Sequence, residues 1–232
     1  VKNHTNDVKE KGPCIRIAYE QGFHVDLVVY AFEKNGAQET FHLAHRDSGW
    51  RPADPPKLLS YVDSINKKYE GTEDSLSSTT QFRRVVRYLK RWDDEALPEE
   101  SDAKPSGLGY TLMTDQYSNG PKKDDDVSML FQISEKASTL LTRIQIYKPT
   151  PEHEDLFSKL SESDMNALKG RFKDMKNALV EAQKEKSIKK ACKLLKQEFG
   201  RDFPVPDDDE SVKGGYSVRA ERTTQVQGNR FA

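Results

Sequence analysis

The chain has 232 residues, enough for one large domain or two modest ones, and 32% of them are charged although the formal net charge is only −1. A charge so near zero argues against a long nucleic acid or an anionic membrane surface as the main partner. No apolar run approaches the ~20 residues that cross a bilayer, no signal peptide is evident, and the two cysteines lack metal-ligand spacing, so we expect a cytoplasmic protein without a membrane partner.

Residues 13–45 are predicted to form three antiparallel strands. "PCIRIAY" alternates, Gln21-Gly22 is a plausible turn, and Asn35-Gly36 is a stronger hairpin signal that leads into "ETFHLAH". Between these turns, "EQGFHVDLVVYAF" (residues 20–32) is expected to be one strand. Since side chains alternate between the faces of a strand, one of its faces should belong to the core: Phe23, Val25, Leu27, Val29 and Ala31.

Asp26 interrupts this apolar strand. A lone ionised carboxylate in apolar surroundings costs several kcal/mol unless a cation or hydrogen-bond donors meet it. Asp26 should therefore meet a metal ion, a basic side chain or water, and an ion pair near the edge of a sheet is the simplest interpretation.

The rest of the chain is predicted to be mostly helical, which gives an α+β fold with the strands first. Asp54 should cap a helix of about residues 55–69, with Pro55 and Pro56 in its first turn. The next helix has one apolar face: Phe82, Val85, Val86, Leu89 and Trp92. Three more helical segments are "VSMLFQISEKASTLLTRIQI", capped by residues 124–126, "SESDMNALKGRFKDMKNALVEAQ" and "SIKKACKLLKQEFG".

Two features favour an anion site. Lys90 borders the apolar stripe of its helix and could extend its ammonium into a cleft, whereas the neighbouring Arg83, Arg84, Arg87 and Arg91 are expected mostly in solvent. Ser106, in "KPSGLGYTL", should cap a helix whose free N–H groups and dipole attract anions, although a plain cap explains it as well. Together, the lysine and the capped helix would suit a triphosphate.

These segments resemble a known family in their order and spacing. "HVDLVVY", "RRVVRYLKRW" and "PSGLGYTLMT" are similar to the bacterial cGAS/DncV-like nucleotidyltransferases (CD-NTases) of the DNA polymerase β-like superfamily. The resemblance runs from about residue 13 to 206 and includes "WRPADPPKLLSYV", "YKPTPEHEDLFSKLSESD" and "KACKLLKQEFGRDFPVP". It implies the later part of a nucleotidyltransferase core (1–76), a helical domain that closes the nucleotide cleft (77–206), and a flexible C-terminal tail (207–232).

The resemblance also implies roles for the candidate residues. Members of the family hold two Mg²⁺ ions with three carboxylates, of which the first two form a D-x-D motif after a Gly-Ser loop and the third stands where Asp26 does. Asp26 would thus be a catalytic metal ligand, for Mg²⁺ or a substituting Mn²⁺, while Lys90 and Ser106 would bind the nucleotide. No Gly-Ser loop with a D-x-D motif is found, so we expect the later part of such an enzyme, inactive alone.

The implied activity joins nucleoside triphosphates, with ATP expected among them, into a cyclic di- or trinucleotide second messenger. In bacteria such messengers serve the anti-phage systems called CBASS, in some of which an E1/E2-like protein conjugates the C-terminal carboxylate of the synthase, here Ala232. Two alternatives are an oligoadenylate synthetase-like enzyme with linear products and a non-catalytic helical interaction module whose Asp26 pairs with Arg16 or a neighbour. No long nucleic acid is expected as a partner.

Overall fold

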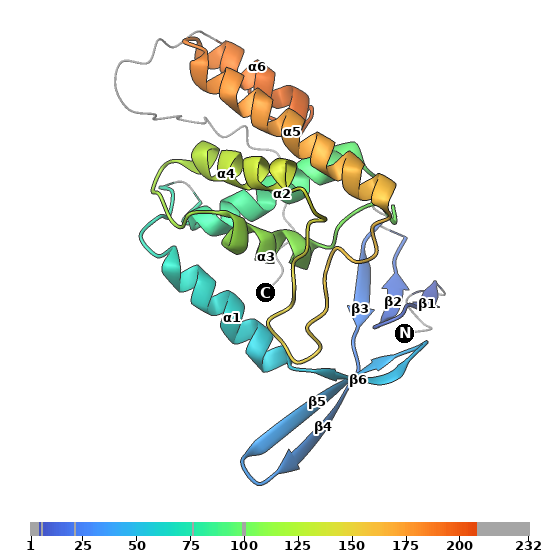
Figure 1. Ribbon diagram of the computed structural model, residues 1–232. Coiled ribbons are helices and arrows are strands. Elements are labelled where there is room, and N and C mark those ends of the chain that lie inside the picture. The colour runs from blue at the N-terminus through green and yellow to red at the C-terminus, as the bar shows by residue number, and fades with distance from the viewer. Residues whose placement is uncertain (1–4, 6, 21, 76, 99–100, 208–232) are drawn as a thin grey trace. The chain divides into compact units, whose positions relative to one another are not determined.

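The computed structural model describes residues 5, 7–20, 22–75, 77–98 and 101–207, with strands first and helices after them (Figure 1). The strands are β1 (Val8–Glu10), β2 (Ile15–Ala18), β3 (His24–Leu27), β4 (Tyr30–Asn35), β5 (Gln38–His45) and β6 (Gly49–Ala53). The helices are α1 (Pro55–Lys68), α2 (Gln81–Ala96), α3 (Gly107–Tyr117), α4 (Asp126–Thr139), α5 (Glu162–Lys184) and α6 (Ile188–Phe199). The predicted α+β class is confirmed.

The chain divides into two compact units, Val1–Asn177 and Ala178–Ala232. The domain boundaries at residues 76 and 206 stay predictions, and the tail from residue 208 lies outside the described residues. No described helix is both long enough and apolar enough to cross a membrane.

The strands form two antiparallel sheets, in the orders β1-β2-β3 and β4-β5-β6. The single strand predicted over residues 20–32 was therefore wrong, because β3 belongs to the first sheet and β4 to the second. The register of β2 with β3, in which Arg16 faces Asp26, would place Pro13 opposite Val29. Proline has no N–H to donate, so this pairing cannot continue, and the chain instead joins β5 through the Ala44 N–H and the Val29 carbonyl at 2.9 Å.

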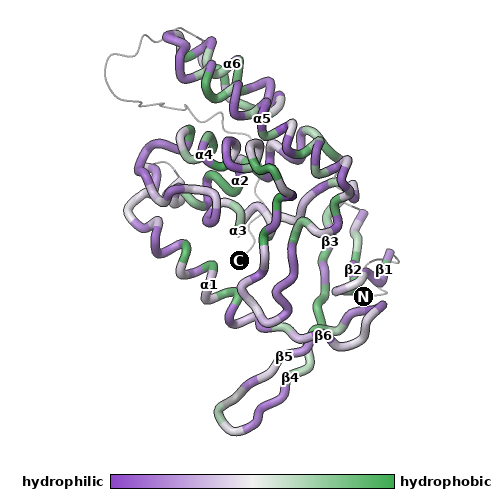
Figure 2. Tube along the Cα trace, viewed as in Figure 1, coloured by the Kyte–Doolittle hydropathy of each residue, from purple (hydrophilic) through white to green (hydrophobic). Residues whose placement is uncertain are grey.

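The apolar face predicted for this stretch is also not part of the described core. Phe23, Val25, Leu27 and Val29 are 41–48% exposed, and Figure 2 shows the hydrophobic stretch at and after β3 in green. Alternation along a strand shows which side chains share a face, but it carries no information about what covers that face.

Four of the helices begin at a residue whose side chain caps them. A side-chain oxygen of the capping residue accepts a hydrogen bond from a first-turn N–H in α1, α3, α4 and α6, at 2.9–3.1 Å; these caps are Asp54, Ser106, Asp125 and Ser187. At the other end of α6, Gly200 adopts a φ of 87°, which glycine tolerates best.

The core of the first unit joins α2, α3, α4 and α5. As predicted, Phe82, Val85, Leu89 and Trp92 of α2 are buried, and the Trp92 ring lies 4.8 Å from that of Phe172 in α5. Each such side chain contributes about 1.5–3 kcal/mol by leaving water. In the second unit, Leu179 and Phe199 are buried, and the Phe199 and Phe203 rings lie 5.7 Å apart.

Helix α4 ends earlier than predicted, at Thr139 rather than near Ile146. Beyond it, Ile144 and Ile146 are fully buried while Gln145 between them is exposed. Alternating burial of this kind is typical of an extended chain. The sequence prediction assigned these residues to the helix because, over so few residues, helical and extended spacing of apolar side chains look alike.

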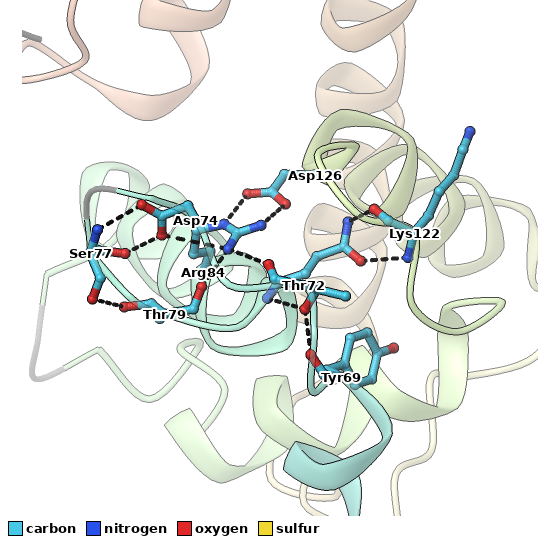
Figure 3. Close-up of polar contacts among 9 residues, drawn as sticks. Tyr69, Thr72, Asp74, Ser77, Thr79, Arg84, Lys122 and Asp126 are labelled. Carbon is cyan, nitrogen blue, oxygen red and sulfur yellow. Dashed lines mark hydrogen bonds and ion pairs between the residues drawn. The ribbon is translucent and has the colours of Figure 1, made fainter. Parts of the chain in front are cut away.

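Arg84 is buried, which corrects the expectation that it lies in solvent (Figure 3). Its Nε and Nη2 donate to the two Asp126 carboxylate oxygens at 2.7 and 2.8 Å, and Nη1 donates to the Thr72 and Thr79 carbonyls. This side of α2 faces the start of α4 and the loop before α2, so the guanidinium ties three segments together.

Gln81, at the start of α2, makes a second connection. Its Nε2 donates to the Lys122 carbonyl at 2.8 Å, and its Oε1 accepts from the Lys122 N–H at 2.9 Å. The Gln81 side chain is fully buried. It holds the loop before α4 by donating one hydrogen bond to the loop backbone and accepting another from it.

Candidate functional site

The N-terminus of α3 has the features of an anion site. Ser106 Oγ accepts from the Gly109 N–H at 3.1 Å, so it acts as the predicted N-cap. The first N–H groups of a helix have no intrahelical partner, and together with the helix dipole they give this end a partial positive charge.

Lys90 of α2 lies against the same helix end. A Cβ built on Gly107 would stand 3.2 Å from Lys90 Nζ and 3.2 Å from its Cε, so any larger residue there would have to shift the end of the lysine by a few tenths of an ångström. The structure thus brings together two of the residues that the sequence singled out, Lys90 and the helix that Ser106 caps.

This arrangement is electrostatically unfavourable by itself. Helix N-termini stabilise negative groups, whereas a lysine ammonium beside one is repelled. Both Lys90 and Ser106 are exposed, so an anion could reach the two positive groups and would relieve their repulsion. Such sites, where local rules are broken without an evident structural gain, are where functional residues are expected.

Asp26 lies elsewhere, on β3, and is paired with Arg16 of β2. Arg16 Nε donates to Asp26 Oδ1 at 2.8 Å and Nη2 donates to Oδ2 at 2.9 Å, a two-bond geometry that follows from their facing positions in the register. The Arg16 hydrogen bond lowers the pKa of Asp26, while burial and the nearby Asp26 charge raise the pKa of the Cys14 thiol. Among the described residues, Asp26 is brought to Arg16 rather than to Lys90 or Ser106.

A Mg²⁺ site needs several oxygen ligands around one point. Within the described ranges no three histidine, cysteine, aspartate or glutamate side chains converge in this way, and both Asp26 oxygens bond to Arg16. The residues described here do not by themselves fit the two ions that the resemblance implies, and the role of Asp26 as a metal ligand stays a prediction. Ala232 lies outside the described residues.

The fold has clear counterparts among solved structures. No protein-family model matches the chain. The apo form of Vibrio cholerae DncV matches with a TM-score of 0.69 and 21% identity over 88% of this chain and 53% of that one. DncV described as a cyclic AMP-GMP synthase, in complex with the linear intermediate 5′ pppA(3′,5′)pG, matches with a TM-score of 0.68 and 20% identity over 85% and 53%. Its GTP-bound form gives 0.68 and 20% over 85% and 52%.

The chain spans about half the length of these solved structures. At 20–21% identity the likeness is one of fold, and it covers 85–88% of this chain. The chain therefore has the fold of the Vibrio cholerae di-nucleotide cyclase DncV, and the resemblance predicted from its sequence is confirmed at that level.

Proposed function

We propose that the chain belongs to a CD-NTase that joins nucleoside triphosphates, ATP among them, into a cyclic di- or trinucleotide. The observation that carries this proposal is the contact of Lys90 with the Ser106-capped end of α3, in a chain with the DncV fold. DncV itself has been solved with GTP and with a linear pppApG intermediate, so this fold accommodates such ligands.

Lys90 and Ser106 have distinct parts in the proposal. The Lys90 ammonium would make a charge-assisted contact with a phosphate, and the free N–H groups at the start of α3 would donate to the same anion. The Ser106 hydroxyl already bonds the Gly109 N–H, so it contributes mainly by holding this end of the helix in shape. Mg²⁺, or Mn²⁺ in its place, would supply Lewis-acid chemistry, with Asp26 as one ligand by resemblance.

Asp26 and Arg16 provide the test of catalysis. In the full protein incubated with ATP and GTP, Asp26→Asn is expected to abolish product formation, whereas Arg16→Met is expected to retain it. Both variants lose the same ion pair, which contributes at most about 1 kcal/mol at this partly exposed position, so a difference between them reports on the carboxylate alone. Products are measured by mass spectrometry, with melting temperatures as a folding control.

Equal activity in these two variants would contradict the metal-ligand role. A wild type that forms no product would favour the non-catalytic module, the alternative that the Arg16–Asp26 pair supports. An active wild type whose product has free ends would favour the linear-product alternative instead.

Gly107 offers a more selective test of the phosphate contact. In Gly107→Ala the new Cβ would crowd Lys90 Nζ and shift it by a few tenths of an ångström, so we expect ATP affinity to fall by up to about tenfold. The melting temperature should stay the same or rise, because alanine is favoured over glycine in helices by up to about 1 kcal/mol. Isothermal titration and thermal unfolding measure the two effects.

Gly170→Ala in α5 is the matched control, since a Cβ there meets no atom within 4 Å. An unchanged ATP affinity in Gly107→Ala would argue against the Lys90 contact.

The proposal extends to features that the resemblance alone implies. These are a cytoplasmic location, a role in anti-phage defence, and conjugation of the Ala232 carboxylate by an E1/E2-like partner. Each stays a proposal for the whole protein.

A further inference from the structure

A buried ion pair lies one helical turn from Lys90. Asp93 of α2 is fully buried, and its Oδ1 accepts a hydrogen bond from Arg171 Nη1 of α5 at 3.0 Å. The guanidinium carbon of Arg171 lies 4.2 Å from the centroid of the Trp92 ring, which also contacts Phe172. Charge and aromatic contacts thus join α2 to α5 at this turn.

Tyr110 brings α3 into the same cluster. It is 1% exposed and lies close enough to Asp93 that the carboxylate charge helps burial to raise the pKa of the tyrosine. Tyr110 OH, Asp93 Oδ2 and Arg171 Nη2 are all buried, and none has a hydrogen-bond partner of standard geometry among the described residues.

The cluster is poorly suited to adding stability. Buried polar atoms without partners each cost about 1–3 kcal/mol, and a buried ion pair seldom repays its desolvation. Burial raises the pKa of Asp93 in spite of Arg171, so ionising this carboxyl costs more in the folded chain than in the unfolded one. A role other than stability would explain why three charged or polar side chains occupy this part of the core.

The positions of these residues indicate that role. Residues three apart lie on the same face of a helix, so Lys90 and Asp93 share a face of α2, and Gly107 and Tyr110 share a face of α3. Lys90 contacts Gly107, and Asp93 lies beside Tyr110. The same two helix faces therefore carry both the candidate phosphate site and the buried cluster.

We propose that Asp93 is a positioning residue: through Arg171 of α5 and Tyr110 of α3 it fixes α2 against both helices and so holds Lys90 at the start of α3. This inference rests on the proposed nucleotide site and adds to it a residue that no local sequence pattern indicates. Asp93 would not touch the nucleotide and would act through Lys90.

A double-mutant cycle tests this coupling. Asp93→Asn is expected to weaken ATP binding about tenfold in the wild-type background but by no more than about twofold in Lys90→Ala, because the group through which Asp93 acts is then gone. Equal losses in the two backgrounds, or an unchanged affinity with only a lower melting temperature, would overturn the proposal.

Asp126→Asn is the matched control. Asp126 also forms an ion pair with a buried arginine of α2, Arg84, but that pair faces α4. This variant should lower the melting temperature and leave ATP affinity unchanged; a loss of affinity like that of Asp93→Asn would show that any damage to α2 has the same effect and would also overturn the proposal.

The Gly107 amide provides a measurement without nucleotide. Its ¹H–¹⁵N chemical shift should respond to removal of the lysine in Lys90→Ala, and Asp93→Asn should move it in the same direction while Asp126→Asn should not. If the wild type binds no ATP, the proposed function fails while this shift still decides the positioning role. Should Asp93→Asn fail to fold, Arg171→Lys, which keeps the charge but loses the planar fork, is measured in the same way.

Discussion

Replacing Lys90 with alanine is expected to weaken ATP and GTP binding by about ten- to a hundredfold, the largest effect of any single surface change. The side chain is exposed and its end lies beside the N-terminus of α3, so truncation removes a charge-assisted contact with phosphate and little packing. The melting temperature should change by no more than a degree or two. Isothermal titration with each nucleotide measures the affinity.

Arg87→Ala is the appropriate control, because Arg87 is an exposed cation one turn earlier on the same helix. It removes the same charge and should change affinity by less than about twofold at physiological salt. If Lys90→Ala leaves affinity unchanged, or if both variants lose it equally, the lysine serves as a solvated cation and the phosphate site must lie elsewhere.

Replacing Arg84 with methionine should lower the free energy of unfolding by about 3 kcal/mol, the largest expected effect on stability. The change leaves the Asp126 carboxylate without its two-bond partner and the Thr72 and Thr79 carbonyls without their shared donor. For a domain of this size the melting temperature should fall by about 6–12 °C. Chemical denaturation followed by circular dichroism measures the free energy.

Its neighbour Arg83 is the control. Arg83 is exposed, and its Nε donates to Asn66 Oδ1 at 3.3 Å, so Arg83→Met should change stability by at most about 0.5 kcal/mol. A similar loss in both variants would mean that the methionine perturbs α2 itself, and the assignment of Arg84 as the tie between three segments would be wrong.

Features that depend on neighbours in the sequence could be predicted. Caps such as Asp54 and Ser106 bond N–H groups only three residues away, and the apolar stripe of α2 follows from helix geometry alone. The contact of Lys90 with α3 belongs with these, because a residue at the edge of an apolar stripe must border whatever covers that stripe.

Features that depend on partners distant in the sequence could not be predicted. Arg84 and Asp126 are 42 residues apart and Asp93 and Arg171 are 78 apart, and no local pattern distinguishes these charges from solvated ones. The break between β3 and β4 likewise depends on Pro13, which precedes β2. For Asp26 the sequence left both a metal ion and a pairing with Arg16 open, because choosing between them needs the register of two strands and the ligands from beyond them.

The bonds of Gln81 to the Lys122 backbone affect how an alignment of relatives would be interpreted. A side-chain amide carries a donor and an acceptor side by side, as the Lys122 backbone requires; glutamate lacks the donor, and asparagine is one methylene shorter. Selection would therefore restrict this position as strongly as a catalytic one, but only because Gln81 holds the loop before α4. Arg84, three residues later, is constrained in the same way. An invariant glutamine at position 81 would therefore be evidence about folding, and it should not be counted among the residues that contact the nucleotide.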